Sequence, residues 1–261
     1  MLILIVLLLA VAGALVLHER WNREEPSKAV LGGERVYLPL PRLDVGGLSV
    51  EEAIAFRRSI REYESTPLTL TQVSQLLWAA QGITDVAHEF RAAPSAGATY
   101  PLIVYLVVGR GGVVGLQAGV YRYDPYTHSL TLVVKGDVRQ KLYEAALEQP
   151  WVRDAPASIV ITAVYKRTTE RYGERGIRYV HMEAGHASQN IYLEATSLGL
   201  GTVSVGAFHD DLVRNLIGAS EDEAPLYIMP VGVPKQKYRV TEEELHSYIV
   251  KKRLEAEREE Q

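Results

Sequence analysis

The sequence contains no cysteine among its 261 residues. Disulfide bonds, thiolate metal sites, iron–sulfur clusters and cysteine nucleophiles are therefore excluded. There is no excess of positive charge either, since the formal net charge is -4, and nucleic acid is not indicated as a partner. Hydrophobic residues make up 47% and charged residues 23%, which is typical of a globular protein and excludes a disordered or collagen-like chain.

Several common catalytic motifs are also missing. The sequence has no GxSxG nucleophile motif and no Walker A loop, and the glycine-dense stretch at 109–115 is not followed by the helix that a dinucleotide-binding loop needs. His181 and His186 are five residues apart, which places them on different faces of a helix. We therefore predict no metal site and no serine-hydrolase chemistry.

One long hydrophobic run is present, at residues 2–17, interrupted only by Gly13. As a helix it spans roughly 24 Å, slightly less than the ~30 Å hydrocarbon core of a bilayer. We predict an N-terminal transmembrane helix within residues 1–20. Arg20 and Arg23 follow it and favour a membrane-anchored protein with a cytoplasmic globular domain. The alternative is a cleaved signal peptide and an extracytoplasmic domain, because the small residues at 12–14 resemble a cleavage site.

The remaining chain divides by composition into a polar linker at 21–47, one domain at 48–240 and a charged C-terminal helix at 241–261. Capping residues and apolar spacing predict helices at 49–64, 69–81, 137–148 and 179–198, a short helix from 210 and the C-terminal helix. Strands are expected at 101–109, 119–124, 129–134, 158–165, 202–205 and 226–231, with a hairpin turn at 125–128. This order favours an α+β fold whose central sheet is mostly antiparallel and flanked by helices.

Four segments carry candidate functional residues. The first, at 57–61, contains three arginines and a serine; as the end of a helix, it would place Arg57 and Arg61 on one face, suited to holding an anion. The second, at 91–101, is a loop of small and hydroxyl residues between two prolines. The third, at 199–208, is a strand almost without large side chains, and the fourth, at 230–239, is a strand that runs into a basic tail. Each also has a plain structural interpretation, as a solvated basic helix end, a loop, a packing turn or a solvated tail.

Taken in order, these segments resemble the nitroreductase family of flavoproteins. The first is similar to the family's Arg-x-Ser-x-Arg/Lys opening, and the second to its Pro-Ser loop. The third resembles its Leu-Gly-Leu-Gly element after a long helix, and the fourth its Pro-Val-Gly-x-Pro ending. Segments 119–125, 171–179 and 183–190 are similar to the SagB-type dehydrogenase branch.

The resemblance implies a nitroreductase-like fold, non-covalent binding of FMN at a homodimer interface, and NAD(P)H as a candidate electron donor. Arg57, Ser59 and Arg61, joined by Arg58, would hold the phosphate and the ribityl or pyrimidine side of the cofactor. A loop from the second subunit would pack against the flavin, and a strand would lie along its ring system with an amide near N5. The implied residues of this loop are Pro94, Ser95, Ala96 and Gly97, those of the strand are Ser204, Val205 and Gly206, and Lys235 or Lys237 would complete the phosphate site.

The resemblance also implies an oxidoreductase that transfers hydride through flavin N5 by a ping-pong mechanism, acting on a small molecule or a peptide. Branch members that oxidise peptide azolines commonly carry Lys-Tyr where this chain has Arg171 and Tyr172. Arginine stays protonated at neutral pH and cannot serve as the general base, so azoline oxidation is an alternative, and Tyr172 is the remaining catalytic candidate. Two further alternatives are a non-catalytic flavin-binding relative and a membrane-tethered interaction domain without a cofactor.

Overall fold

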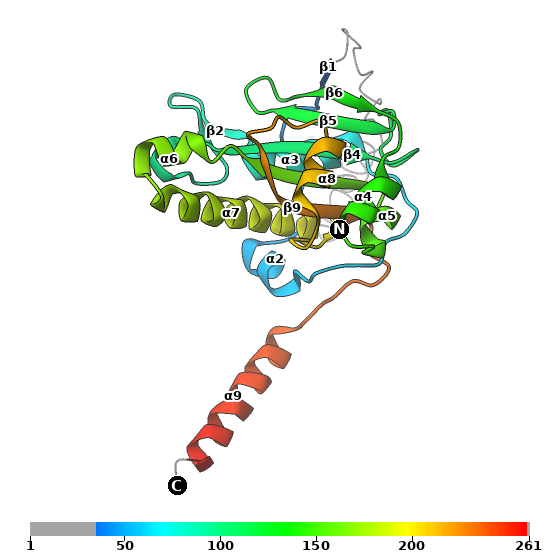
Figure 1. The fold of residues 1–261 in the computed structure, drawn as a ribbon. Coiled ribbons are helices and arrows are strands. Elements are labelled where there is room, and N and C mark those ends of the chain that lie inside the picture. Colours follow the sequence, from blue (N-terminus) through cyan, green and yellow to red (C-terminus); the bar gives the residue numbers. More distant parts are fainter. Residues whose placement is uncertain (1–34, 260–261) are drawn as a thin grey trace, which may run out of the picture.

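The computed structural model describes residues 35–259, and within them the core is one seven-stranded sheet in which every neighbouring pair is antiparallel (Figure 1). A separate two-stranded hairpin is formed by β2 (Ile83–Asp85) and β3 (Phe90–Arg91). The order across the large sheet is β1 (Arg35–Tyr37), β6 (Ser129–Lys135), β5 (Gly119–Asp124), β4 (Leu102–Val108), β7 (Ala157–Ala163), β9 (Ala224–Gly232) and β8 (Gly201–Thr202). The expectation of an antiparallel sheet flanked by helices is met by these residues.

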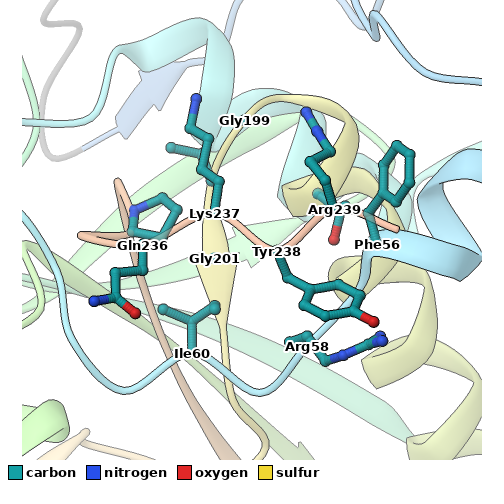
Figure 2. A pocket seen from close by; sticks show the side chains of 12 residues that line it. Phe56, Arg58, Ile60, Gly199, Gly201, Gln236, Lys237, Tyr238 and Arg239 are labelled. Atoms are coloured by element: carbon teal, nitrogen blue, oxygen red, sulfur yellow. The ribbon is translucent and has the colours of Figure 1, made fainter. Parts of the chain in front are cut away.

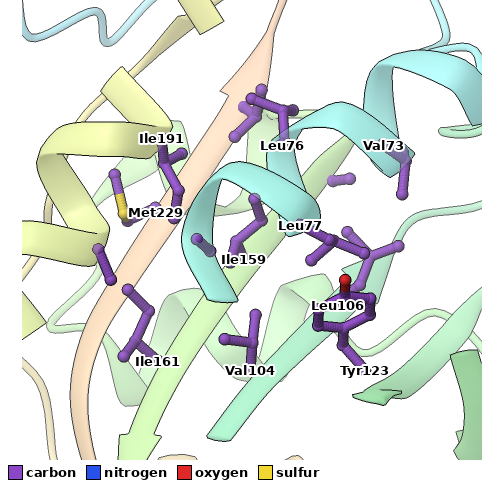
Figure 3. Close-up of a cluster of buried hydrophobic side chains, with 14 of the residues drawn as sticks. Val73, Leu76, Leu77, Val104, Leu106, Tyr123, Ile159, Ile161, Ile191 and Met229 are labelled. Atoms are coloured by element: carbon purple, nitrogen blue, oxygen red, sulfur yellow. The ribbon is translucent and has the colours of Figure 1, made fainter. Parts of the chain in front are cut away.

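Helices cover both faces of the sheet. Successive residues of a strand point to opposite faces, so their side chains enter two different hydrophobic cores. On one face, α3 (Leu70–Gln81) and α7 (Arg175–Ser197) pack Leu76, Leu77 and Ile191 against β4, β7 and β9 (Figure 3). The opposite face is covered by α4 (Arg139–Ala145), α5 (Pro150–Asp154) and α8 (Asp210–Leu216). Because alternate residues of a strand point to opposite faces, both faces of β4 need apolar side chains, and all seven of its residues are buried.

Capping signals located several helix starts correctly. Ser49 and Glu52 form a capping box on α2 (Val50–Phe56), and Thr69 with Gln72 forms one on α3, which ends at Gly82. Thr241 and Glu244 cap α9 (Glu242–Glu259), in which no residue is buried. Figure 1 shows α9 projecting away from the sheet and its helices.

Other boundaries differ from the prediction. The helix predicted at 49–64 ends at Phe56, because Arg57 takes up an extended conformation with ψ 127°. The helix predicted at 137–148 is divided into α4 and α5. The long helix begins at Arg175 and not near residue 179, and the preceding α6 (Lys166–Tyr172), absent from the prediction, is separated from it by Gly173 at φ 58°. β1 lies within the range predicted as linker, which shows that residues 35–37 join the sheet.

The prediction of a transmembrane helix in front of the domain is corrected. Among residues 35–259, no helix is both long enough and apolar enough to cross a membrane. The longest, α7, has 23 residues but carries charged side chains along its length, as an amphipathic helix on a sheet requires. The predicted anchor at 2–17 lies outside the described residues, and the membrane-anchored localisation built on it is not supported.

Candidate functional site

The segment at 57–61 runs in an extended conformation beside β8. Ser59 pairs with Thr202 in a parallel bridge, and the Ile60 amide donates to the Thr202 carbonyl at 2.9 Å. The sequence predicted that Arg57 and Arg61 share one face of a helix. They do not, because the segment is extended. Arg57 and Ser59 both contact Tyr192, because alternate residues of an extended chain point the same way, whereas the Arg61 guanidinium lies near Trp151 of α5.

Tyr192 of α7 joins the first and third candidate segments. Its hydroxyl lies 3.1 Å from the Ser59 hydroxyl and accepts a hydrogen bond of 2.8 Å from the Ser204 amide. The Arg57 guanidinium lies 5.1 Å from the centre of the Tyr192 ring, and the Ser188 and Ser204 hydroxyls are 2.7 Å apart. We call Arg57, Ser59, Ser188, Tyr192 and Ser204 the Tyr192 cluster.

Sequence reasoning did not identify Ser188 and Tyr192. A signal for them existed, since two hydroxyl-bearing residues four positions apart lie on one face of a helix. What the spacing could not reveal is that this face meets the edge of the sheet at β8, which depends on how α7 packs. The tertiary structure is therefore needed to identify these two hydroxyls as part of the candidate site.

Arg57 of the Tyr192 cluster and Arg61, two residues after Ser59, have no acidic partners within residues 35–259. Neither Arg57 nor Arg61 forms a salt bridge with any residue of the described part of the chain. Arg57 is half-buried, and the exposed Arg61 guanidinium lies 5.3 Å from the Trp151 ring centre. Two such guanidiniums beside a hydroxyl form a set of donors that suits a phosphate group.

The chain after Ser204 opens onto the surface. Val205 is buried and pairs with Ile228 through two backbone hydrogen bonds. Gly206 is exposed, and a Cβ atom placed on it would meet only the Tyr227 ring, at 3.8 Å. A flat group can therefore approach this backbone closely without displacing a side chain.

Gly201 is where the extended segment crosses β8. A Cβ atom added there would lie 2.6 Å from Ile60 Cγ1 and 2.8 Å from Ile60 Cβ, which are fixed close to the backbone. We expect Gly201→Ala to lower the free energy of unfolding by about 1–3 kcal/mol, as overpacking does, and to separate Ser59 from Tyr192. Chemical denaturation measures this loss. Gly185→Ala is the control, since its Cβ meets nothing within 4 Å, and an equal loss in both variants would contradict the argument.

Arg58, Lys235 and Lys237 lie apart from the Tyr192 cluster. Arg58 donates to the carbonyls of Ala55 and Arg57, and its guanidinium lies 3.5 Å from the Tyr238 ring centre. With Lys237 it lines a separate hollow between the extended segment, the turn after α7 and residues 234–239 (Figure 2). The exposed Lys235 is held near residue 62 by a hydrogen bond from its amide to the Glu62 carbonyl.

The loop at 94–97 lies beside α6 and the first half of α7. The Ser95 hydroxyl accepts from the Tyr100 amide at 3.0 Å, and Arg171 donates to the Gly97 carbonyl at 3.0 Å. Gly97 has φ 60°, and an added Cβ atom would meet the side chains of Arg171 and Tyr172. Arg171 and Tyr172 therefore contact the loop directly, and Arg171 holds its backbone in place.

Within one chain this loop does not join the Tyr192 cluster. The residue of α7 beside the loop is Glu183, nine positions before Tyr192, which corresponds to about 13 Å along a helix. Glu183 is 2% exposed, and among residues 35–259 one of its carboxylate oxygens has no hydrogen-bond partner. Burial raises its pKa to about 7, although Ser95, Arg91 and Gln81 act in the opposite direction.

Comparisons with known proteins identify the family of the chain. The sequence model described as "Nitroreductase family" matches residues 54–233. A protein of Methanocaldococcus jannaschii, provisionally named a nitroreductase, is 49% identical over 200 residues, which cover 77% of this chain and 98% of that protein. A crystal structure from Ralstonia eutropha with the same provisional name is 30% identical, with a TM-score of 0.68 and coverage of 78% of this chain and 91% of that one.

A more distant relative has a more specific name. The trifolitoxin-processing protein TfxB of Rhizobium leguminosarum bv. trifolii is 29% identical over 195 residues, or 68% of this chain. The match spans only 52% of TfxB, so about half of TfxB has no counterpart in this chain.

Proposed function

Because the chain belongs to the nitroreductase family, we propose that it is an FMN-dependent oxidoreductase, formed by the domain predicted at 48–240. The observation that carries this proposal is the convergence of Arg57, Ser59 and Ser204 on Tyr192. These residues come from three separate parts of the sequence, and they bring cations, hydroxyls and an open glycine backbone to one edge of the sheet.

The residues present fit the cofactor. A phosphate needs cations that are not already neutralised, and Arg57 and Arg61 meet this need within the described residues. A flat ring needs a surface without side chains, which Gly206 offers. When bound, FMN would supply reversible two-electron chemistry.

The role of the chain itself is then to bind and orient the cofactor. Arg57, Arg61 and the Ser59 hydroxyl would hold the phosphate and ribityl end. Lys237 lines the separate hollow with Arg58, and Lys235 is held beside Glu62, so neither lysine is assigned to this end. Val205, fixed to β9 by two hydrogen bonds, would hold the backbone of Ser204 and Gly206 along the ring. The Tyr192 hydroxyl, bonded to both Ser59 and Ser204, would keep the two ends of the site in register.

A homodimer would complete this site. The loop of Pro94, Ser95, Ala96 and Gly97 lies away from the Tyr192 cluster of its own chain, so we propose that it packs against the cofactor of a second subunit. Apolar side chains on the outer faces of α2 and α7 support an interface there, since Val50, Ile54 and Met182 are each more than half exposed.

The substrate is a small molecule or a peptide, and the SagB-type dehydrogenase branch is the finer assignment that we propose. The relationship to TfxB favours peptide azoline oxidation as the alternative activity. Arg171 argues against the lysine-dependent form of that reaction, because its guanidinium stays protonated and is bonded to Gly97. Tyr172 is the candidate acid or hydrogen-bond donor.

Anaerobic flavin bleaching tests the proposed function. We expect the purified protein to be yellow and to lose its flavin absorbance when NADPH or NADH is added. A yellow protein that no donor bleaches would instead indicate a non-catalytic flavin-binding relative. A folded, colourless protein that takes up no added FMN would contradict the proposal.

A further inference from the structure

A second hollow lies away from the Tyr192 cluster, bordered by the loop at 91–101, the β5–β6 hairpin and α6. Its volume is about 370 Å³, which is within the range of small-ligand sites. Apolar walls come from β4, with Leu102, Ile103 and Val104, and aromatic ones from Tyr123 and Tyr126. None of these residues belongs to the site described above.

Four arginines line this hollow. Arg35, Thr131 and Arg122 are cross-strand partners on β1, β6 and β5, so their side chains lie on one face of the sheet. Arg167 of α6 and Arg91 add two more guanidiniums. In the part of the chain that the structure describes, none of the four forms a salt bridge.

Nearby carboxylates balance these charges only in part. Asp124 is the only acidic residue in the lining of this pocket. Its partial burial tends to raise its pKa, but hydrogen bonds from Thr127 and Tyr126, together with the charge of Arg35, outweigh this effect and lower the pKa, so Asp124 is ionised at neutral pH and attracts Arg35. Glu183 lies behind the wall, where its charged form attracts Arg91. The lining therefore presents four cations and one anion.

Two buried donors, on Gln81 and Arg91, line another part of the hollow, beside α3. Gln81 is 1% exposed, and its carbonyl oxygen accepts a hydrogen bond of 3.0 Å from Arg91 Nη1. Arg91 Nε is buried and has no hydrogen-bond partner among residues 35–259. Gln81 Nε2 is also buried, but it lies close enough to the Glu183 carboxylate to lower its pKa. An unpaired buried donor is costly, and one beside unneutralised guanidiniums is suited to an incoming oxygen anion.

The arginine at the centre of this wall is held in place. The Arg91 guanidinium lies 4.5 Å from the Tyr100 ring centre and 5.5 Å from that of Tyr126. Arg167 donates to the Tyr100 carbonyl at 3.1 Å, which ties α6 to the same loop. The guanidinium is therefore pre-organised, which lowers the entropy lost when a ligand binds.

We infer that this hollow binds the carboxylate or phosphate group of a small organic anion, whose apolar part would lie against β4. Planar guanidiniums pair with either group through two parallel hydrogen bonds. The residues that line this hollow differ from those of the Tyr192 cluster, although the loop at its border is the one that we propose to pack against the flavin of a second subunit.

Isothermal titration at low ionic strength tests the inference, with inorganic phosphate and benzoate as separate probes and sodium chloride as the ionic control. We expect phosphate, benzoate or both to bind to the full-length protein. The probe that binds shows whether the hollow takes a phosphate or a carboxylate group. Arg122→Gln and Arg35→Gln, both at exposed positions, are each expected to weaken binding about tenfold without changing flavin content.

Arg110→Gln is the matched control, because Arg110 is exposed and lies outside the hollow. Unchanged affinity in this variant, together with loss in the other two, would support the site. Binding that all three variants retain, binding that chloride reproduces at equal ionic strength, or no binding of either probe would overturn it. Circular dichroism confirms that each variant is folded, so a loss of binding reports on the site.

Discussion

Arg57→Ala is expected to weaken FMN binding by about 10- to 100-fold, so that the purified variant contains little flavin. Arg57 stacks on Tyr192 within the cluster that joins the three segments, and it has no acidic partner among the described residues. A charge-assisted hydrogen bond to phosphate contributes about 1.5–3 kcal/mol, which corresponds to this range of affinity. Fluorescence titration of the apoprotein with FMN gives the dissociation constant.

Arg58→Ala is the matched control. It removes the neighbouring arginine, whose guanidinium lies on Tyr238 on the other side of the extended segment. We expect its FMN affinity to stay within about threefold of the unmodified protein, since it leaves the Tyr192 cluster intact. If Arg57→Ala kept its flavin, or if Arg58→Ala lost as much, the assignment of the phosphate site would be wrong.

The unmodified protein is expected to lose stability as the pH rises, and Glu183→Gln is expected to remove much of that loss. Burial raises the Glu183 pKa from 4.5 to about 7, so between these values the folded protein keeps a proton that the unfolded chain releases. Stability contributed by the protonated group is therefore present below pH 4.5 and lost as the pH approaches 7. The difference in pKa corresponds to a loss on the order of 3 kcal/mol.

Denaturant unfolding at pH 5 and at pH 8 measures this effect. Relative to the unmodified protein, the glutamine variant should gain more stability at pH 8 than at pH 5, because glutamine never acquires the buried charge. Glu64→Gln, at an exposed position, should follow the unmodified protein at both values. Identical pH dependence in the Glu183 variant and the unmodified protein would show that Glu183 does not titrate as described.

Local signals in the sequence predicted most of the elements. The capping boxes at Ser49 and Thr69 fix the starts of α2 and α3 because they need only residues within one helical turn. The strands β4, β5 and β6 followed from continuous or alternating apolar residues and from the hairpin turn between β5 and β6. The family's motifs were likewise readable in order, although none is specific alone.

The errors occurred where distant segments meet. Residues 57–61 have the composition of a helix end, but they pair with Thr202, and that pairing decides their conformation. β1 is too short to be recognised by itself, and it exists because β6 offers a free edge. α6 was not predicted and α7 was predicted to begin near residue 179, because neither helix starts with a side-chain cap that the sequence could reveal.

The sequence alone determined the α+β class of fold and the absence of cysteine chemistry, and it supplied candidate residues for a flavin site. Tertiary structure alone decided which of those residues meet: alternation in an extended segment sends Arg57 and Ser59 to Tyr192 and sends Arg58 to Tyr238. The physical reason is that helix caps and strand patterns act over a few residues, whereas the site is formed by hydrogen bonds between segments more than a hundred residues apart.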